Sequence, residues 1–169
     1  MIELERTYLA KYLPDDLEKS EKKEIIDIYI PENSVHPCVR IRKNGDKYEI
    51  TKKTPLKDDP SEMREQTIKL TEKEFEIFSK LPGRRVSKIR YLYPYKDRIA
   101  EFDVFQEALK GLVVIDFEFK KKETKDSFEM PEFCLADVTG ELFIAGGMIC
   151  GKSYEDIKSE LDKFDYKIL

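Results

Sequence analysis

The sequence predicts an α+β protein built mainly on an antiparallel sheet. Short segments in which apolar and charged residues alternate recur along the chain, and turn signals separate them. Only two stretches show the apolar spacing of a helix, and no repeat or linker rich in Gly or Ser interrupts the chain. At 169 residues the chain is long enough to bury one core, so we expect a single domain spanning residues 1–169.

Eight segments have the period of two that a strand with two different faces requires. Asn44-Gly45 suits the positive φ angles of a type I′ turn and predicts a hairpin, and residues 93–98 contain a second turn signal. Prolines fall at or beyond the ends of these segments, where the missing N–H disturbs no ladder. The expected strands are residues 2–9, 23–30, 37–43, 46–53, 63–70, 85–93, 98–105 and 112–120.

Two helices are expected, at residues 71–81 and 153–164. Thr71 is a candidate N-cap for the first, and Glu74 three residues later completes the pattern of a capping box. Ser153 begins the second helix in the same way. The apolar residues of both segments recur at helical spacing, so each helix is expected to pack one side against the sheet.

Composition argues against several classes of protein. The 31 Lys and Arg residues are outnumbered by 35 Asp and Glu, whereas a general nucleic-acid binder is usually basic. No apolar run is long enough to span a membrane and no signal peptide is evident, so we expect a cytoplasmic protein without a membrane partner. The three cysteines are far apart and lack CxxC spacing, which favours reduced thiols over a disulfide framework or a zinc site.

Pairs of like charges share one face of several expected strands, because residues i and i+2 point the same way. A solvated face usually interleaves the two signs, since like charges on neighbouring strands repel. The residues between the charges are large and apolar, so the opposite face needs cover. A sheet covered outside and charged inside predicts a closed barrel lined with ions. The pairs are Glu3 and Glu5, Arg40 and Arg42, Lys88 and Arg90, Glu101 and Asp103, and Asp116 and Glu118.

Such a lining is stable only if ligands supply the missing charge, because an unpaired buried ion is costly. Clustered carboxylates suit Mg²⁺ or Mn²⁺, which take oxygen ligands and often bridge to substrate phosphates. Guanidinium and ammonium groups suit phosphate oxygens. Acidic and basic strands around one cavity therefore predict a site for a metal-bound polyphosphate. The plain alternative is a solvated charged face, which is the commoner arrangement for any single strand.

A series of short motifs carries these charges in a fixed order. The motifs are Glu3-Leu4-Glu5-Arg6-Thr7, Val39-Arg40-Ile41-Arg42, Thr51-Lys52-Lys53, Met63-Arg64-Glu65, Lys88-Ile89-Arg90-Tyr91, Glu101-Phe102-Asp103-Val104-Phe105, Gly111-Leu112 followed by Asp116-Phe117-Glu118-Phe119, and Asp137-Val138-Thr139. Each is weak alone, but their order and spacing over residues 1 to about 157 resemble the CYTH superfamily, the triphosphate tunnel metalloenzymes. The resemblance implies an eight-stranded antiparallel β-barrel, open at both ends, with helices packed outside.

The resemblance also implies a role for each matched charged residue. The expected ligands of Mg²⁺ or Mn²⁺ are Glu3, Glu5, Glu101, Asp103, Asp116 and Glu118. The residues expected to hold the phosphate chain are Arg40, Arg42, Lys53, Arg64, Lys88 and Arg90. Those expected to act in catalysis are Glu3, Glu5, Lys88 and Arg90. One metal would position the triphosphate, and a second, with the carboxylates, would orient a water for attack on phosphorus.

Thr7 departs from the pattern, because the family has a lysine at this position. Arg6 points to the opposite face, and Lys11 lies about 13 Å along the strand, too far to replace the missing ammonium. We therefore expect weaker phosphate binding or a shifted substrate preference. The leading function is hydrolysis of inorganic triphosphate or a nucleoside triphosphate by a monomer or homodimer. The alternatives are an adenylate cyclase, a polyphosphate- or nucleotide-binding protein with weakened catalysis, and a scaffold barrel without a ligand.

Two further motifs are expected to be structural. The run Lys120-Lys121-Lys122 follows the last expected barrel strand and is predicted to be a solvated end. The glycines Gly146, Gly147 and Gly151 only superficially resemble a phosphate-binding loop, because no strand clearly precedes them. We expect them to serve packing.

Overall fold

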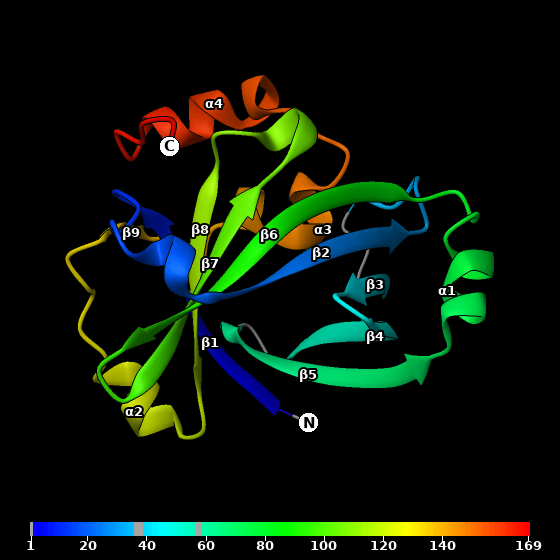
Figure 1. Ribbon diagram of the computed structural model, residues 1–169, viewed down its shortest axis with the longest axis horizontal. Coiled ribbons are helices and arrows are strands. Elements are labelled where there is room, and N and C mark those ends of the chain that lie inside the picture. Colours follow the sequence, from blue (N-terminus) through cyan, green and yellow to red (C-terminus); the bar gives the residue numbers. More distant parts are fainter. Residues whose placement is uncertain (1, 36–38, 57–58) are drawn as a thin grey trace.

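The computed structural model describes residues 2–35, 39–56 and 59–169, and it does not describe the side chains of residues 2–3, 55–56 and 59–63. These ranges contain nine strands, arranged as Figure 1 shows. The strands are β1 (Ile2–Ala10), β2 (Glu21–Ile30), β3 (Val39–Asn44), β4 (Lys47–Leu56), β5 (Asp59–Leu70), β6 (Arg84–Tyr95), β7 (Arg98–Phe105), β8 (Val113–Phe119) and β9 (Cys134–Asp137).

The helices are short and lie mostly outside the sheet. They are α1 (Glu72–Phe78), α2 (Lys122–Asp126), α3 (Gly146–Ile149) and α4 (Tyr154–Asp162), with 3₁₀ turns at Leu17–Lys19, Glu107–Leu109 and Leu142–Ile144. Both predicted helices are present and both capping boxes form, at Thr71 and at Ser153. Among the described residues, no helix is both long and apolar enough to cross a lipid bilayer.

All eight predicted strands are confirmed, within a few residues at their ends. The start of the third, residues 37–38, lies outside the described residues. The sequence did not predict β9, α2 or α3. The predicted solvated end is confirmed, because Lys120, Lys121 and Lys122 are all exposed, and α2 begins at Lys122.

The strand order is β5-β4-β3-β2-β6-β7-β8-β1-β9, and every pairing is antiparallel. One edge of β1 pairs with β8. Its other edge pairs first with β5, where Ile2 is opposite Arg64, and then with β9, where Tyr8 is opposite Asp137. β5 stands at the far end of this order and also pairs with β1. This pairing closes the eight strands β1 through β8 into a ring (Figure 1). The predicted eight-stranded arrangement is confirmed, with β9 added at its edge.

The outward-facing apolar residues of β1, β7 and β8 form one of two buried clusters. Phe102, Ile115 and Phe117 are fully buried in it, and Phe128 and Phe133 cover them from the chain after β8. Aromatic pairs at such spacings add to the stability given by burial alone.

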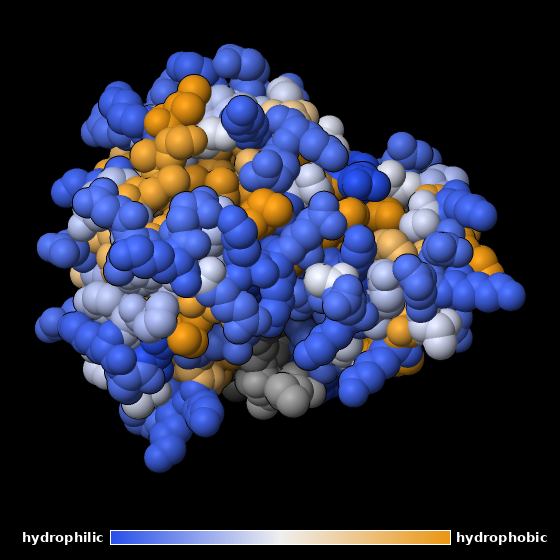
Figure 2. All heavy atoms as spheres, in the orientation of Figure 1, coloured by the Kyte–Doolittle hydropathy of each residue, from blue (hydrophilic) through white to orange (hydrophobic). Residues whose placement is uncertain are grey.

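The visible surface is largely hydrophilic (Figure 2). Cys134 and Cys150 are buried free thiols, as predicted, and Cys38 lies outside the described residues.

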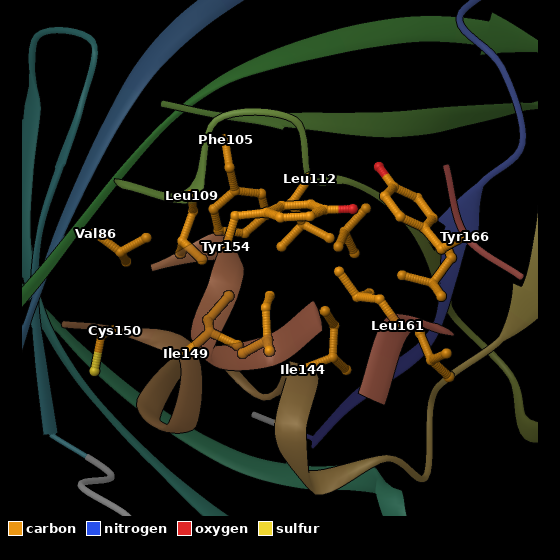
Figure 3. Packing of buried hydrophobic residues seen from close by; sticks show 14 of the residues in the cluster. Val86, Phe105, Leu109, Leu112, Ile144, Ile149, Cys150, Tyr154, Leu161 and Tyr166 are labelled. Atoms are coloured by element: carbon orange, nitrogen blue, oxygen red, sulfur yellow. The ribbon is translucent and has the colours of Figure 1, made fainter. Parts of the chain in front are cut away.

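The second cluster fills one end of the barrel. Val86, Phe105 and Val114 share strand faces with the charged pairs, yet they pack against Ile149 and the other apolar residues of the C-terminal segment (Figure 3). The prediction of a tunnel open at both ends is therefore wrong at this end. The charged part of the interior lies beyond this apolar plug.

Gly146 shows why the glycine-rich stretch serves packing. A Cβ atom built on Gly146 would lie 2.2 Å from the Tyr29 hydroxyl oxygen, closer than real contacts allow. Only a glycine lets α3 approach β2 this closely. The predicted packing role is confirmed at this position.

Candidate functional site

The strand register gathers the predicted acidic residues on one concave wall. Glu5 of β1 is directly opposite Glu118 of β8, and Thr7 is opposite Asp116. Asp116 is in turn opposite Glu101 of β7. Directly opposite residues of antiparallel strands point to the same face, so these side chains line one patch.

For Glu3, a predicted site residue, the structure describes only the backbone. Its backbone lies in β1 opposite Met63 of β5, and its side chain is outside the described part of the structure. Among the described residues, no three Asp, Glu, His or Cys side chains form a ready metal-binding group.

Asp103 and Arg90 form the centre of a buried ionic network. Arg90 donates to Asp103 through Nε at 2.6 Å and through Nη2 at 2.6 Å, which is the bidentate geometry of a strong pair. Lys88 donates to the same carboxylate, and Arg90 also contacts Glu101. The Nη2 atom of Arg90 lies 3.3 Å from Asp116 Oδ2. One guanidinium therefore connects three carboxylates.

The ionisation of Asp103 follows from these contacts. Its side chain is 1% exposed, and although burial raises the pKa of a carboxyl group, Arg90 and Lys88 together lower the pKa of Asp103 below its ordinary value. Burial also lowers the pKa of Lys88, and Asp103 opposes that effect. Asp103 is thus committed to the two cations of β6, and the structure does not leave it as an open metal ligand.

Glu101 shows the opposite effect. Burial raises its pKa to about 7, and Asp116, Asp103 and Glu118 add to this shift while Arg90 opposes it. Negative charges are crowded here, and Arg90 does not neutralise them fully. A divalent cation would relieve this crowding, although the described side chains do not already form a group of three ligands.

Thr7 connects the acidic wall to the segment after β9. Its hydroxyl donates to Asp116 Oδ1 at 2.8 Å, and its backbone N–H donates to Thr139 Oγ1 at 3.0 Å. Arg6 points to the other face, as predicted, and pairs there with Asp137 at 2.8 Å. The Asp137-Val138-Thr139 motif therefore holds β1 through a contact with the outward-pointing Arg6 and a hydrogen bond with the Thr7 backbone.

Asp27 of β2 is a site residue that the sequence did not predict. It is 2% exposed and directly opposite Arg42, which donates to it through Nε at 2.6 Å and through Nη2 at 2.7 Å. Nε of Arg40 lies 4.0 Å from Asp27 Oδ1 and has no hydrogen-bond partner among the described residues, although it is buried. One signal could have revealed Asp27: it is the single acid in the apolar stretch Ile25-Ile26-Asp27-Ile28-Tyr29.

The basic residues of β4 and β5 are placed only partly as predicted. Lys53 is opposite Glu65, with 3.5 Å between Nζ and Oε2, and Thr51 and Thr67 share a hydrogen bond of 3.0 Å on the same face. Arg64 precedes Glu65, so strand alternation directs it to the other face, and it is exposed. The structure does not bring Arg64 to the charged interior, where Glu65 takes the inward position.

An antiparallel ring of strands around a charged interior defines a class of tunnel-shaped proteins. The CYTH domain model matches residues 1–134, well over half of the chain. The chain belongs to the CYTH domain family.

Individual relatives agree with this assignment. An inorganic triphosphatase of Nitrosomonas europaea is 28% identical over 141 residues, which cover 82% of this chain and 90% of the relative. A solved structure of an inorganic triphosphatase has a TM-score of 0.64 at 23% identity, covering 89% of this chain and 95% of that one. A structure from Bacillus halodurans, proposed to be an adenylate cyclase, has a TM-score of 0.55 at 15% identity, covering 99% and 91%. The two structural likenesses support the fold alone.

Proposed function

We propose that the protein hydrolyses triphosphate compounds, inorganic triphosphate or a nucleoside triphosphate, within the charged interior of one CYTH domain spanning residues 1–169. The observation that carries the proposal is the meeting of an acidic wall and a row of buried guanidinium and ammonium groups in one interior. A buried guanidinium with an unfilled donor, the Nε atom of Arg40, calls for an anion. The inorganic triphosphatase among the relatives supports the same chemistry.

Mg²⁺ or Mn²⁺ fits the acidic wall. The residues that would hold the ion are Glu3, Glu5, Glu101, Asp116 and Glu118. We assign Asp103 a different task, to hold Lys88 and Arg90 in position, because its oxygens are already engaged by both cations. A bound divalent ion would neutralise phosphate charge and favour attack on phosphorus.

The basic residues would bind the phosphate chain. Arg40, Arg42 and Lys53 approach the interior from β3 and β4, and Lys88 and Arg90 from β6. We propose that Lys88 and Arg90 stabilise the charge that develops on the transferred phosphoryl group, while Glu3 and Glu5 act from the acidic wall. We also propose a cytoplasmic protein, monomeric or homodimeric, without a nucleic-acid or membrane partner.

A panel of triphosphates assayed by phosphate release with Mg²⁺, with Mn²⁺ and with EDTA tests the proposal. We expect release from tripolyphosphate or a nucleoside triphosphate only with a metal. Cyclic AMP formed from ATP and Mn²⁺ would instead identify a cyclase. A thermal shift with tripolyphosphate but no hydrolysis would identify a binding protein, and the absence of both would leave a scaffold.

Two variants separate the proposed roles. Glu5→Gln is expected to lose metal-dependent turnover while retaining anion binding, because it removes a charge from the acidic wall. Arg40→Gln is expected mainly to weaken substrate binding, seen as a raised KM. An equal loss of folded protein in both variants, measured by circular dichroism, would contradict this division.

A further inference from the structure

The Asp27 carboxylate lies in the row of cations that the proposed function assigns to phosphate. It forms a bidentate pair with Arg42, and its side chain is 3% exposed. Arg40 Nε stands 4.0 Å away without a hydrogen bond. A carboxylate is thus held among the groups that would otherwise bind a phosphate oxygen.

Neutralising Arg42 is costly for an anion-binding site. In the bidentate pair, both carboxylate oxygens accept from the guanidinium, so an arriving phosphate meets a cation whose charge is already balanced. The same phosphate also meets the negative charge of Asp27 in a region shielded from water, where such repulsion is strong. Asp27 therefore opposes the binding of anions, and more strongly the greater their charge.

We propose, on the basis of the proposed function, that Asp27 selects the metal-bound form of the triphosphate by repelling the free form. The interaction of a fixed charge with a ligand scales with the charge of the ligand. Free triphosphate carries more negative charge than its complex with a divalent ion. Asp27 consequently penalises the free anion more than the complex, and a triphosphate without metal does not occupy the site unproductively.

Asp27→Asn tests this inference, because the amide keeps the shape and removes the charge. Calorimetry with tripolyphosphate in EDTA gives the metal-free Kd, and the KM with Mg²⁺ follows the metal-bound form. In the variant we expect the metal-free Kd to fall about tenfold or more, a change that one unit charge a few ångströms away can cause. The KM with Mg²⁺ should fall by a smaller factor.

Matched variants identify the cause. Asp27→Glu keeps the charge and is expected to keep the preference for the metal-bound form. Asp162→Asn removes a charge from an exposed pair with Lys158 on α4, and it should change neither constant. An Asp27→Asn protein that binds free tripolyphosphate no more tightly than the wild type, or that changes both constants equally, would overturn the inference.

Loss of folding in Asp27→Asn would not end the test. Burying Arg42 without its partner is destabilising, so the comparison can be made between Arg42→Gln and the double variant Asp27→Asn/Arg42→Gln. The double variant is expected to bind free tripolyphosphate more tightly, and equal affinities would overturn the inference. If the wild type neither binds nor hydrolyses tripolyphosphate with Mg²⁺, the proposed function fails and the inference fails with it. If the wild type turns over but the variants do not differ, only the inference fails.

Discussion

At the scale of single residues, Thr7 gives the acidic wall a neutral donor. Its hydroxyl bonds to one oxygen of Asp116, and Arg90 lies 3.3 Å from the other oxygen. A lysine in the same place would supply a charge to Asp116 or to a phosphate. Arg90 is thus a cation that already contacts the carboxylate bonded to Thr7, and it is shared among three carboxylates.

We predict that Thr7→Lys raises the affinity for triphosphate or the turnover, because it adds a cation to a wall with excess negative charge. The measurement is kcat/KM for tripolyphosphate with Mg²⁺. Thr7→Val is the control, since it removes the hydroxyl without adding charge and should not raise either value. An unchanged kcat/KM in Thr7→Lys would mean that Arg90 already supplies the necessary charge.

The alternation of side chains between the two faces of a strand predicted many of the site residues, but only where like charges came in pairs. It placed Lys88 and Arg90 on one face correctly, because two like charges at i and i+2 are visible in the sequence. Asp27 is a single acid between apolar neighbours, so a search for pairs of like charges does not find it. The ion pairs of Asp103 with Lys88 and Arg90 could not be predicted either, because they depend on which strands become neighbours.

At the scale of elements, the two predicted helices differ in how they are attached. Both begin with a complete capping box, but α1 contains no buried residue, whereas α4 buries Tyr154, Ile157 and Leu161. The elements that the sequence did not predict are short: β9, α2 and α3 have four or five residues. Four or five residues cover about one helical turn or two strand repeats, too few to show a recognisable pattern. These elements form because tertiary partners such as β1 hold them.

We predict that Ser153→Ala lowers the free energy of unfolding by about 1 kcal/mol, the usual cost of a lost N-cap. The loss should be global, because α4 packs on the apolar plug. Thr71→Ala is the matched change in α1, and it should affect global unfolding less, since α1 can fray without exposing buried residues. Urea unfolding followed by circular dichroism measures both. Equal or reversed effects would contradict this difference in coupling.

At the scale of the whole molecule, one face of the strands serves two purposes. In the middle of the barrel it is charged, and toward the C-terminal helices it becomes apolar with Val86, Phe105 and Val114. The sequence predicted the charged face, but those apolar residues resemble ordinary strand residues and gave no indication that they close one end. The closed end thus stabilises the fold together with the outer apolar cluster, and the crowded carboxylates of the charged part oppose this stability.

The destabilising effect of the crowded carboxylates predicts how the stability of the protein depends on pH and on a divalent metal. Burial and neighbouring carboxylates raise the pKa of Glu101 from 4.5 to about 7, so the folded protein binds a proton that the unfolded chain releases. The stabilisation from that proton is complete below about pH 4.5 and is lost as the pH rises through about 7. Asp27 and Asp103 add no slope in this window, because their pKa values are lowered from 3.8.

In EDTA we therefore expect the Tm to fall as the pH rises from about 4.5 and to level off above about pH 7. Glu101→Gln should flatten this dependence, because it removes the titrating group. Mg²⁺ should raise the Tm most at the upper end, where the carboxylate is ionised and can bind the ion. Differential scanning calorimetry at several pH values measures these effects, and Asp162→Asn serves as the control for loss of an acid outside the barrel. A Tm that rises over this range in EDTA, or an unchanged slope in Glu101→Gln, would show that the acidic wall does not carry the proposed excess of negative charge.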